Sequence, residues 1–390
     1  MTQPHLVRDA IGPDLPLDEV MAAIALGVVS LLLAGVLPAI LGELADEHRL
    51  SVAGIGLTAT FEALAMGLAA ACAGIVLPAR HLKWIGAGAC LLLALADFAT
   101  LAAQDTGVMA IRAAAGVPEG ILLWITIGMI ARTGTPERWA GVFFTALTAG
   151  QLVIAFLFAQ WILPAFGADG GFAALAIVSL AGIAAAIFVP SRYAPLAQEP
   201  GDSGAPPLRG WFALFATLVY IGATATVGVY LQPLAHEAGL GADVAWTAVW
   251  VSLAAQIAGG ATATLIGGHV RYFTVFVIST AIMLATWIAF LLHPPAWAFI
   301  AANALGGYVT ILVSAFLVPM TIEADPSRRT AVLSGSTQVL ASALGPFAAS
   351  FVVADDNVRG VIGLGVLLLF LGLGLIAALH FTSARNSHTV

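Results

Sequence analysis

Residues 108–131 read VMAIRAAAGVPEGILLWITIGMIA. As a helix rising about 1.5 Å per residue, this run is long enough to cross the roughly 30 Å hydrocarbon core of a lipid bilayer. Two ionisable residues, Arg112 and Glu119, interrupt the apolar run. A charge at the bilayer centre costs about 2.5–3.5 kcal/mol on insertion scales. We therefore expect both side chains to face the interior of a helix bundle or a water-filled cavity.

The composition of the whole chain agrees with a membrane protein. The chain is 61% hydrophobic and 9% charged, whereas soluble proteins average about 25% charged residues. There are too few charges for a polar shell, so the solvent around most of the surface must be lipid. Lys83 is the single lysine, and no basic stripe is present, which argues against nucleic-acid binding.

Apolar runs of membrane-spanning length recur along the chain and predict an all-α protein with twelve transmembrane helices. The runs are too long for strands, and the ~10-residue alternating segments of a β-barrel are absent. Met21 begins the first run, which exceeds the length of a cleavable signal and is expected to be retained. The twelve predicted spans are residues 21–44, 51–77, 83–104, 108–131, 138–163, 171–190, 210–235, 243–267, 272–293, 296–321, 329–353 and 359–381.

A polar segment divides six spans from six. It is rich in Pro, Gly and charge, which is typical of a flexible linker. We expect an N-terminal six-helix bundle over residues 1–190, a linker over 191–209, and a C-terminal six-helix bundle over 210–390. Eleven basic residues fall in loops on the side of both termini and only Arg49 and Arg359 on the other. This asymmetry predicts cytoplasmic N- and C-termini in a multi-pass protein of the cell inner (plasma) membrane.

The two halves also share spacings between polar residues and prolines. Such parallel repeats, related by a pseudo-two-fold axis, are a transporter architecture with the site between the halves. The matched intervals run from Pro38 to Glu62 (24) and Pro233 to Gln256 (23), and from Arg112 to Pro136 (24) and Asn303 to Pro326 (23).

With these features the chain resembles the major facilitator superfamily of twelve-span secondary transporters. The most specific match is Arg112 followed by Gly116 and Gly120, which is similar to the family's fourth-span signature linked to proton coupling. The loop over residues 74–84 keeps Arg80 and Lys83 but lacks the family's Asp and its Gly-Arg pair. Residues 149–151 read Ala-Gly-Gln, where drug/proton antiporters of the family carry a proline and glycine element.

Four ionisable residues fall deep inside spans and are our candidates for proton coupling. A buried carboxylate beside an arginine that comes and goes during transport can load and release a proton. Glu62 or Glu119 would carry the proton, Arg112 would modulate it, and a static ion pair that fixes helix packing is the alternative. The candidates for proton coupling are Glu62, Asp97, Arg112 and Glu119.

Polar residues at mid-depth are candidates for contact with a solute, or else for hydrogen bonds between helices. In the family fold, spans one, four, seven and ten line the cavity, which favours residues on those spans. The charge of the solute stays open, because organic acids, cations and amphipathic compounds all fit the candidate set. The candidates for substrate binding are Arg112, Glu119, Gln151, Tyr230, Gln256, Asn303, Tyr308 and Gln338.

The sequence argues against an enzyme. His236-Glu237 begins like a zinc-protease motif, but Leu240 stands where the second histidine is needed. No nucleophile elbow, nucleotide loop or metal-ligand spacing occurs, so we expect no cofactor and no metal. We therefore predict a secondary active transporter of a small organic solute, coupled to protons and working by alternating access as symporter or antiporter. It is expected to be a monomer, and the alternatives are an uncoupled facilitator or a transporter-like receptor without flux.

Overall fold

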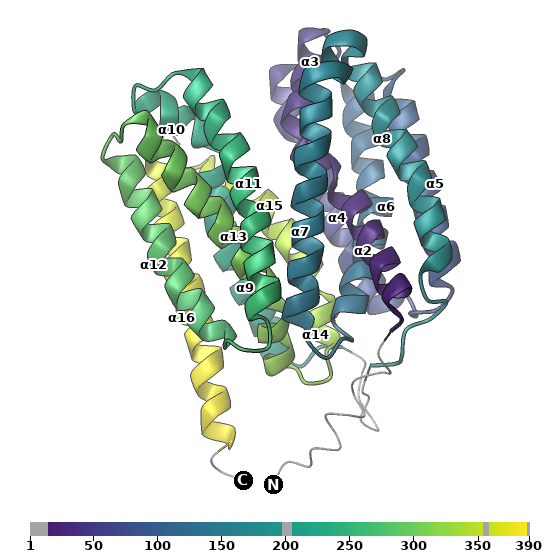
Figure 1. Ribbon diagram of the computed structural model, residues 1–390, viewed down its shortest axis with the longest axis vertical. Helices are drawn as coiled ribbons and strands as arrows, with labels where there is room; N and C mark the ends of the chain where they lie inside the picture. The colour runs from purple at the N-terminus through teal and green to yellow at the C-terminus, as the bar shows by residue number, and fades with distance from the viewer. Residues whose placement is uncertain (1–14, 197–204, 354–358, 388–390) are drawn as a thin grey trace.

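The computed structural model describes residues 15–196, 205–353 and 359–387, and this part of the chain is helical throughout apart from its loops. Figure 1 shows the helices running roughly parallel to the long axis. The first half contains α2 (Leu17–Leu31), the short turn η1 (Leu33–Gly35), α3 (Leu37–Asp46), α4 (Val52–Val76), α5 (Leu82–Thr100), α6 (Thr106–Ile130), α7 (Pro136–Leu157), the π-helical turn η2 (Phe158–Ile162) and α8 (Leu163–Phe188). The second half contains α9 (Leu208–Gly228), α10 (Leu231–Glu237), α11 (Ala242–Ile266), α12 (Tyr272–Leu291), α13 (Ala296–Ala324), α14 (Arg329–Val332), α15 (Ser334–Ala349) and α16 (Gly360–Ser387).

Nine helical stretches among the described residues are long and apolar enough to cross a membrane. One of them, Pro136–Phe188, has 53 residues and covers both the fifth and the sixth predicted spans. The chain bends within it at Gly167, where φ is +60°, a conformation that glycine adopts without strain. The segments α2–α3 and α14–α15 coincide with the first and eleventh predicted spans but are broken, so the count of twelve spans stays a prediction.

The first and seventh predicted spans are each broken in two, which the sequence analysis did not anticipate. Gly35 N bonds to Leu32 O at 3.3 Å in the turn between α2 and α3, so the Leu31 carbonyl loses its helical donor. Gln151 Nε2 donates to that carbonyl at 2.8 Å. The same kind of break separates α9 from α10 at Tyr230. Each break lies a few residues before a proline, which cannot donate a backbone hydrogen bond.

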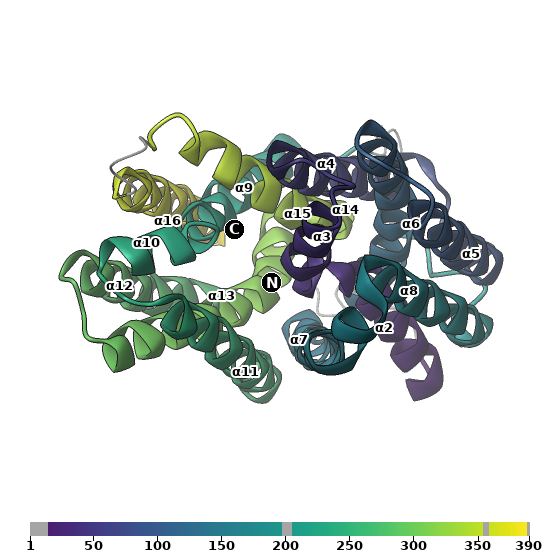
Figure 2. The ribbon, with the colours of Figure 1, turned by 90° about the horizontal axis from the view of Figure 1, so that it is seen from above.

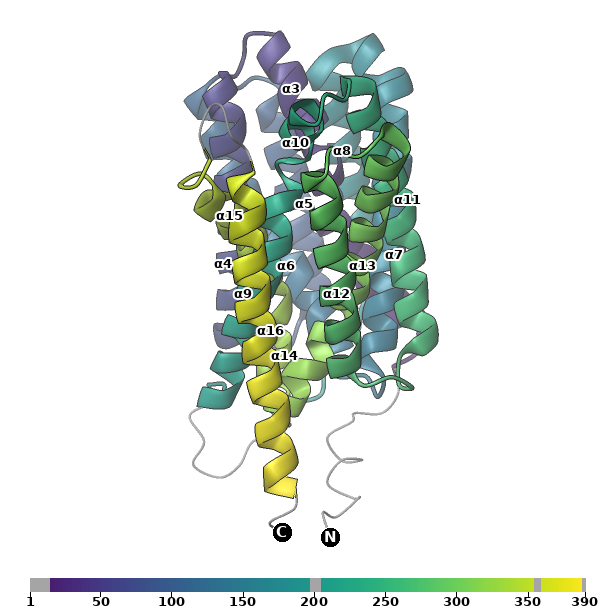
Figure 3. The ribbon, with the colours of Figure 1, turned by 90° about the vertical axis from the view of Figure 1, so that its left-hand side faces the viewer.

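The helices form two bundles, α2–α8 and α9–α16, which Figure 2 shows side by side. In Figure 3 the second bundle faces the viewer, with α16 at its edge. The boundary between the bundles falls between α8 and α9, where the linker was predicted; its residues 197–204, like residues 1–14, lie outside the described part of the chain. The division into residues 1–190, 191–209 and 210–390 therefore stays a prediction in its details.

Corresponding helices make close contacts through glycine in both bundles. A Cβ on Gly116 of α6 would lie 2.9 Å from Met66 N of α4. A Cβ on Gly259 of α11 would lie 3.1 Å from the Tyr308 carbonyl carbon of α13. At both positions a Cβ would press against the backbone of the facing helix, and small residues permit such close approach of membrane helices. The pairs α4–α6 and α11–α13 thus match the repeat seen in the sequence.

The bundles are joined at the end where α2 begins and α16 ends, and they diverge toward the other end (Figure 1). We call the joined end the basic end, since most loop arginines lie there. Arg328 Nη1 donates across it to the carbonyls of Ala131 and Thr133, at 2.8 and 2.7 Å. A Cβ on Gly141 of α7 would lie 2.6 Å from Thr264 N of α11. The two halves are therefore packed backbone to backbone at this end.

Candidate functional site

One buried arginine contacts three carboxylates inside the first bundle. Arg112 Nη1 donates to Asp97 Oδ1 at 2.7 Å, and Arg112 Nη2 donates to Glu62 Oε1. Glu119 Oε1 lies 3.6 Å from the same Nη2 atom. Arg112 has no exposed surface, and the carboxylate residues are 2–4% exposed. All four predicted proton-coupling residues therefore meet in one ion cluster, defined here as Arg112, Glu62, Asp97 and Glu119.

Three helices, α4, α5 and α6, bring these side chains together. Arg112 and Glu119 both lie on α6, about two turns apart, so they share a face. Gly116 lies between them on that face and lets α4 approach, which places Glu62 against the arginine. Asp97 comes from α5, and its buried carboxylate points toward Arg112.

Side chains from α8 complete the surroundings of the ion cluster. Ser179 Oγ donates to Asp97 Oδ2 at 3.3 Å, and the Phe172 ring centroid lies 5.4 Å from the Arg112 guanidinium carbon. Three buried polar atoms close to the cluster have no hydrogen-bond partner among the described residues: Glu62 Oε2, Arg112 Nε and Thr58 Oγ1. Thr58 precedes Glu62 by one helical turn on α4, so the unpaired oxygens of these two residues lie on the same face of that helix.

The charges of the ion cluster do not balance if every group is ionised. One guanidinium against three carboxylates leaves two negative charges among side chains that are almost fully buried. A buried charge without a partner is strongly unfavourable. Protons on the carboxylates would remove this excess.

A small cavity lies beside the ion cluster. Its volume is about 10 Å³, close to the minimum that one water molecule needs. Asp97, Glu119 and Ser179 provide its polar atoms, and Leu32 and Leu33 of the broken first span provide part of its apolar wall. A water molecule here could carry a proton between the two carboxyl groups.

A larger cavity of about 450 Å³ lies between the bundles. Its wall comes mainly from the second bundle, with Leu31 of α2 and Phe144 of α7 from the first. None of the described residues that line it is charged. This volume is in the usual range for small-molecule sites. We call it the central cavity.

Three of the predicted substrate-binding residues line the central cavity: Gln256, Asn303 and Gln338. Asn303 Nδ2 donates to Ala248 O at 2.9 Å, so part of its amide is occupied by a helix contact. The side-chain amides of Gln256 and Gln338 have no hydrogen-bond partner among the described residues, and they come from different helices, α11 and α15. These two amides can therefore offer donors and acceptors to a bound solute.

The other five predicted substrate-binding residues are absent from the lining of the central cavity. Arg112 and Glu119 belong to the ion cluster, because their face of α6 packs against α4 and not against the second bundle. Gln151 caps the Leu31 carbonyl. Tyr308 donates to Thr262 Oγ1 at 3.0 Å, and Tyr230 lies at the break before α10. These five residues differ from the other three in the direction that their side chains face from the helix. Position in the sequence alone does not give that direction.

Some residues of the two sites were not singled out from the sequence. Ser179 and Phe172 belong to a span treated only as an apolar run, although a lone serine there was a detectable signal. Ser252 lines the central cavity, and nothing in the local sequence separates it from packing residues.

Comparisons with known proteins identify the fold. No protein-family model and no curated protein matches this sequence. The chain is similar in structure to the human organic anion transporter MFSD10 (TETRAN), with a TM-score of 0.72 and 14% identity over 93% of this chain and 100% of that chain. It is also similar to FucP, a major facilitator superfamily transporter in the outward conformation, with a TM-score of 0.72 and 14% identity over 92% of this chain and 98% of that chain.

A second FucP structure, described as the E. coli fucose:proton symporter, matches with a TM-score of 0.68 and 14% identity over 92% of this chain and 98% of that chain. The chain therefore has the major facilitator fold, as the sequence predicted. The structures named here, those of MFSD10 and FucP, are described as transporters.

Proposed function

We propose that this chain is a secondary transporter that moves a small, uncharged, polar solute together with protons by alternating access. The observation that carries the proposal is the separation of two sites: an ion cluster inside the first bundle and an uncharged cavity between the bundles. The transporter nature of the similar structures supports it, and FucP is itself described as a proton symporter.

The central cavity supports an uncharged solute. A charged solute in a cavity of about 450 Å³ would need a partner of opposite sign, and the described lining supplies none. Gln256 and Gln338 instead offer amides that suit hydroxyl or carbonyl groups. This narrows the solute classes that the sequence left open and argues against assigning Arg112 to the solute.

The ion cluster supports proton coupling. In our proposal Arg112 pairs with one ionised carboxylate while protons neutralise the others. Loss of a proton would leave a buried negative charge, so each proton state would favour a different packing of α4, α5 and α6. Because the protonated and deprotonated clusters favour different conformations, proton binding is coupled to the conformational change.

The first span offers a physical connection between the two sites. Leu31 of α2 faces the central cavity, while Leu32 and Leu33 face the small cavity beside Asp97 and Glu119. These residues lie at the break between α2 and α3, where the backbone lacks regular helical bonds. We propose that solute binding shifts this break and thereby changes the access of water to the cluster.

The basic end is proposed to face the cytoplasm, because the loops on that side contain the excess of Arg and Lys residues. The packed bundles at this end and their divergence at the other support an outward-facing state. FucP, whose matching structure is described as outward, has a similar arrangement.

Charge movement in proteoliposomes tests the proposal directly. The purified chain is reconstituted, and neutral sugars, polyols and amides are applied while the capacitive current is recorded on a supported membrane. Since the solute is uncharged, any current that it drives reports the coupled proton. We expect current with the wild-type chain and a large loss with Glu62→Gln and Glu119→Gln, whereas the exposed Asp243→Asn control keeps it.

The other outcomes separate the alternatives. Solute flux without current would identify an uncoupled facilitator, and binding without flux would identify a receptor. Full currents in both glutamate variants would remove the cluster from the coupling mechanism. Flux limited to organic acids or cations would overturn the uncharged solute.

A further inference from the structure

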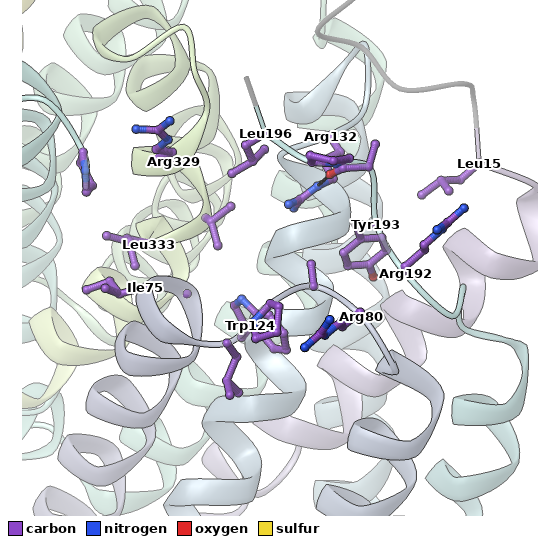
Figure 4. A pocket seen from close by; sticks show the side chains of 18 residues that line it. Leu15, Ile75, Arg80, Trp124, Arg132, Arg192, Tyr193, Leu196, Arg329 and Leu333 are labelled. Carbon is purple, nitrogen blue, oxygen red and sulfur yellow. Dashed lines mark hydrogen bonds between the residues drawn. The ribbon is translucent and has the colours of Figure 1, made fainter. Parts of the chain in front are cut away.

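A cavity of about 880 Å³ lies at the basic end, apart from the ion cluster and the central cavity. It is lined by the end of α4, the loop before α5, the second half of α6 with Arg132 just beyond it, the segment after α8, and α14 with the following Leu333. Figure 4 shows arginines around it: Arg80, Arg132 and Arg192 with the first bundle, and Arg329 with the second. We call it the arginine pocket. None of its described lining residues is acidic.

Two of the arginines are held side by side by the backbone. Arg80 and Arg192 form an isolated antiparallel bridge, which Tyr193 N supports by donating to Ala79 O at 2.9 Å. Both arginines are exposed, and neither has an ion-pair partner among the described residues. The backbones of two positive residues are thus fixed next to each other at the pocket, and no described acidic residue pairs with either side chain.

The third arginine is oriented by its own contacts. Arg132 Nε donates to Ala194 O at 2.8 Å, and its guanidinium lies 5.2 Å from the Tyr193 ring centroid. Burial lowers the pKa of Arg132 to about 10, which still leaves it charged at neutral pH. Arg329 extends the positive wall on the opposite side, where its Nη1 also contacts Ala205 O at 3.5 Å.

We propose that the arginine pocket binds a phosphate group, with an anionic phospholipid headgroup as the favoured source. Planar guanidinium groups match phosphate oxygens in pairs, which lysine cannot do as well. Basic pockets between membrane helices on the cytoplasmic side suit anionic headgroups. Ile75 and Leu77, both exposed apolar residues, border the pocket and offer a surface for an acyl chain.

The position of the pocket gives such a ligand a structural consequence. It is lined by both bundles at the end where they are joined. A phosphate there would contact arginines of both halves at once. The ligand would therefore stabilise the joined arrangement of the bundles.

Lipid titration of the purified full chain tests this site. Thermal unfolding in detergent is followed while phosphatidylglycerol, phosphatidylcholine or inorganic phosphate is added, and apparent affinities are derived from the shifts. We expect stabilisation by phosphatidylglycerol but not by phosphatidylcholine. The double variant Arg80→Gln/Arg192→Gln is expected to bind phosphatidylglycerol about thirtyfold more weakly.

The matched control is Arg138→Gln/Arg271→Gln, which removes two exposed arginines of the basic end that do not line the pocket. It should keep the wild-type affinity, and both double variants should unfold at the wild-type temperature in phosphatidylcholine. Binding of inorganic phosphate, lost in the pocket variant, would support the site with a soluble phosphate ester as its source. Equal losses in both double variants, or equal effects of the two lipids, would overturn the proposal.

Discussion

Removal of the Arg112 side chain charge should destabilise the folded protein more than almost any other single substitution. Arg112→Leu keeps an apolar side chain in the space but leaves Glu62, Asp97 and Glu119 without a counter-charge. Arg112 has no exposed surface, so water cannot replace the guanidinium. The cluster must then shed its remaining charge by taking up protons, or the helices must separate.

The magnitude follows from the contacts. Arg112 makes two hydrogen bonds to carboxylates and a third contact at 3.6 Å. A hydrogen bond to a charged group contributes about 1.5–3 kcal/mol, which gives about 3–6 kcal/mol for two. In other proteins, removal of one partner of a buried ion pair lowers the free energy of unfolding by about 3–5 kcal/mol. We expect a loss of about 4 kcal/mol for Arg112→Leu.

A double-mutant cycle measures whether the loss arises from unbalanced charge. Unfolding in mixed micelles is compared for wild type, Arg112→Leu, Glu62→Gln and the double variant. Because Glu62→Gln removes one of the stranded carboxylates, the double variant should be more stable than the sum of the single losses predicts. The exposed Arg271→Leu should change stability by less than about 0.5 kcal/mol.

Two results would refute this reasoning. Wild-type stability of Arg112→Leu would mean that the arginine is not needed to balance the cluster. Strict additivity in the cycle would mean that Arg112 and Glu62 do not interact in the folded protein.

Four further predictions concern other parts of the chain. Gln256→Ala and Gln338→Ala should each weaken solute binding about five- to tenfold without changing the melting temperature, as one lost hydrogen bond predicts; binding assays check this. Gln151→Leu should lower the free energy of unfolding by about 1–3 kcal/mol, because it leaves a buried carbonyl unpaired, and an unchanged value in chemical unfolding would contradict the cap. Arg328→Gln should loosen the basic end, seen as faster labelling of cysteines introduced between the bundles. Burial raises the pKa of the Tyr193 hydroxyl above its usual value of 10.0, so the folded state holds that proton more tightly than the unfolded state does. The free energy of unfolding should therefore fall as pH rises above about 10. Tyr193→Phe should reduce this pH dependence in chemical unfolding.

The sequence predicted the fold to a large extent because the bilayer imposes a simple rule. Every backbone polar group in the membrane must be paired within its own helix or barrel, so long apolar runs predict helices. The boundaries of α4, α6, α11 and α12 lie within a few residues of the predicted spans. The breaks after Leu31 and Gly228 were not predicted, because a proline near a span end is compatible with either a kink or a stop.

The candidate site was predicted in its residue types but not in its grouping. A charge in an apolar run is costly, so Glu62, Asp97, Arg112 and Glu119 could be selected from the sequence. Their meeting in one cluster depends on how α4, α5 and α6 pack. Likewise, the repeat pairs Arg112 with Asn303, yet only the second of these lines the central cavity.

By itself, then, the sequence determined the membrane-spanning helices, the two halves, and the few polar residues that cannot face lipid, because each follows from the local cost of placing a group in hydrocarbon. The tertiary structure decided which of those residues meet. It placed three carboxylates on one arginine, two amides in an uncharged cavity, and four arginines around a pocket. The reason is that the rotation of a helix about its axis is set by contacts with its neighbours and not by its own sequence.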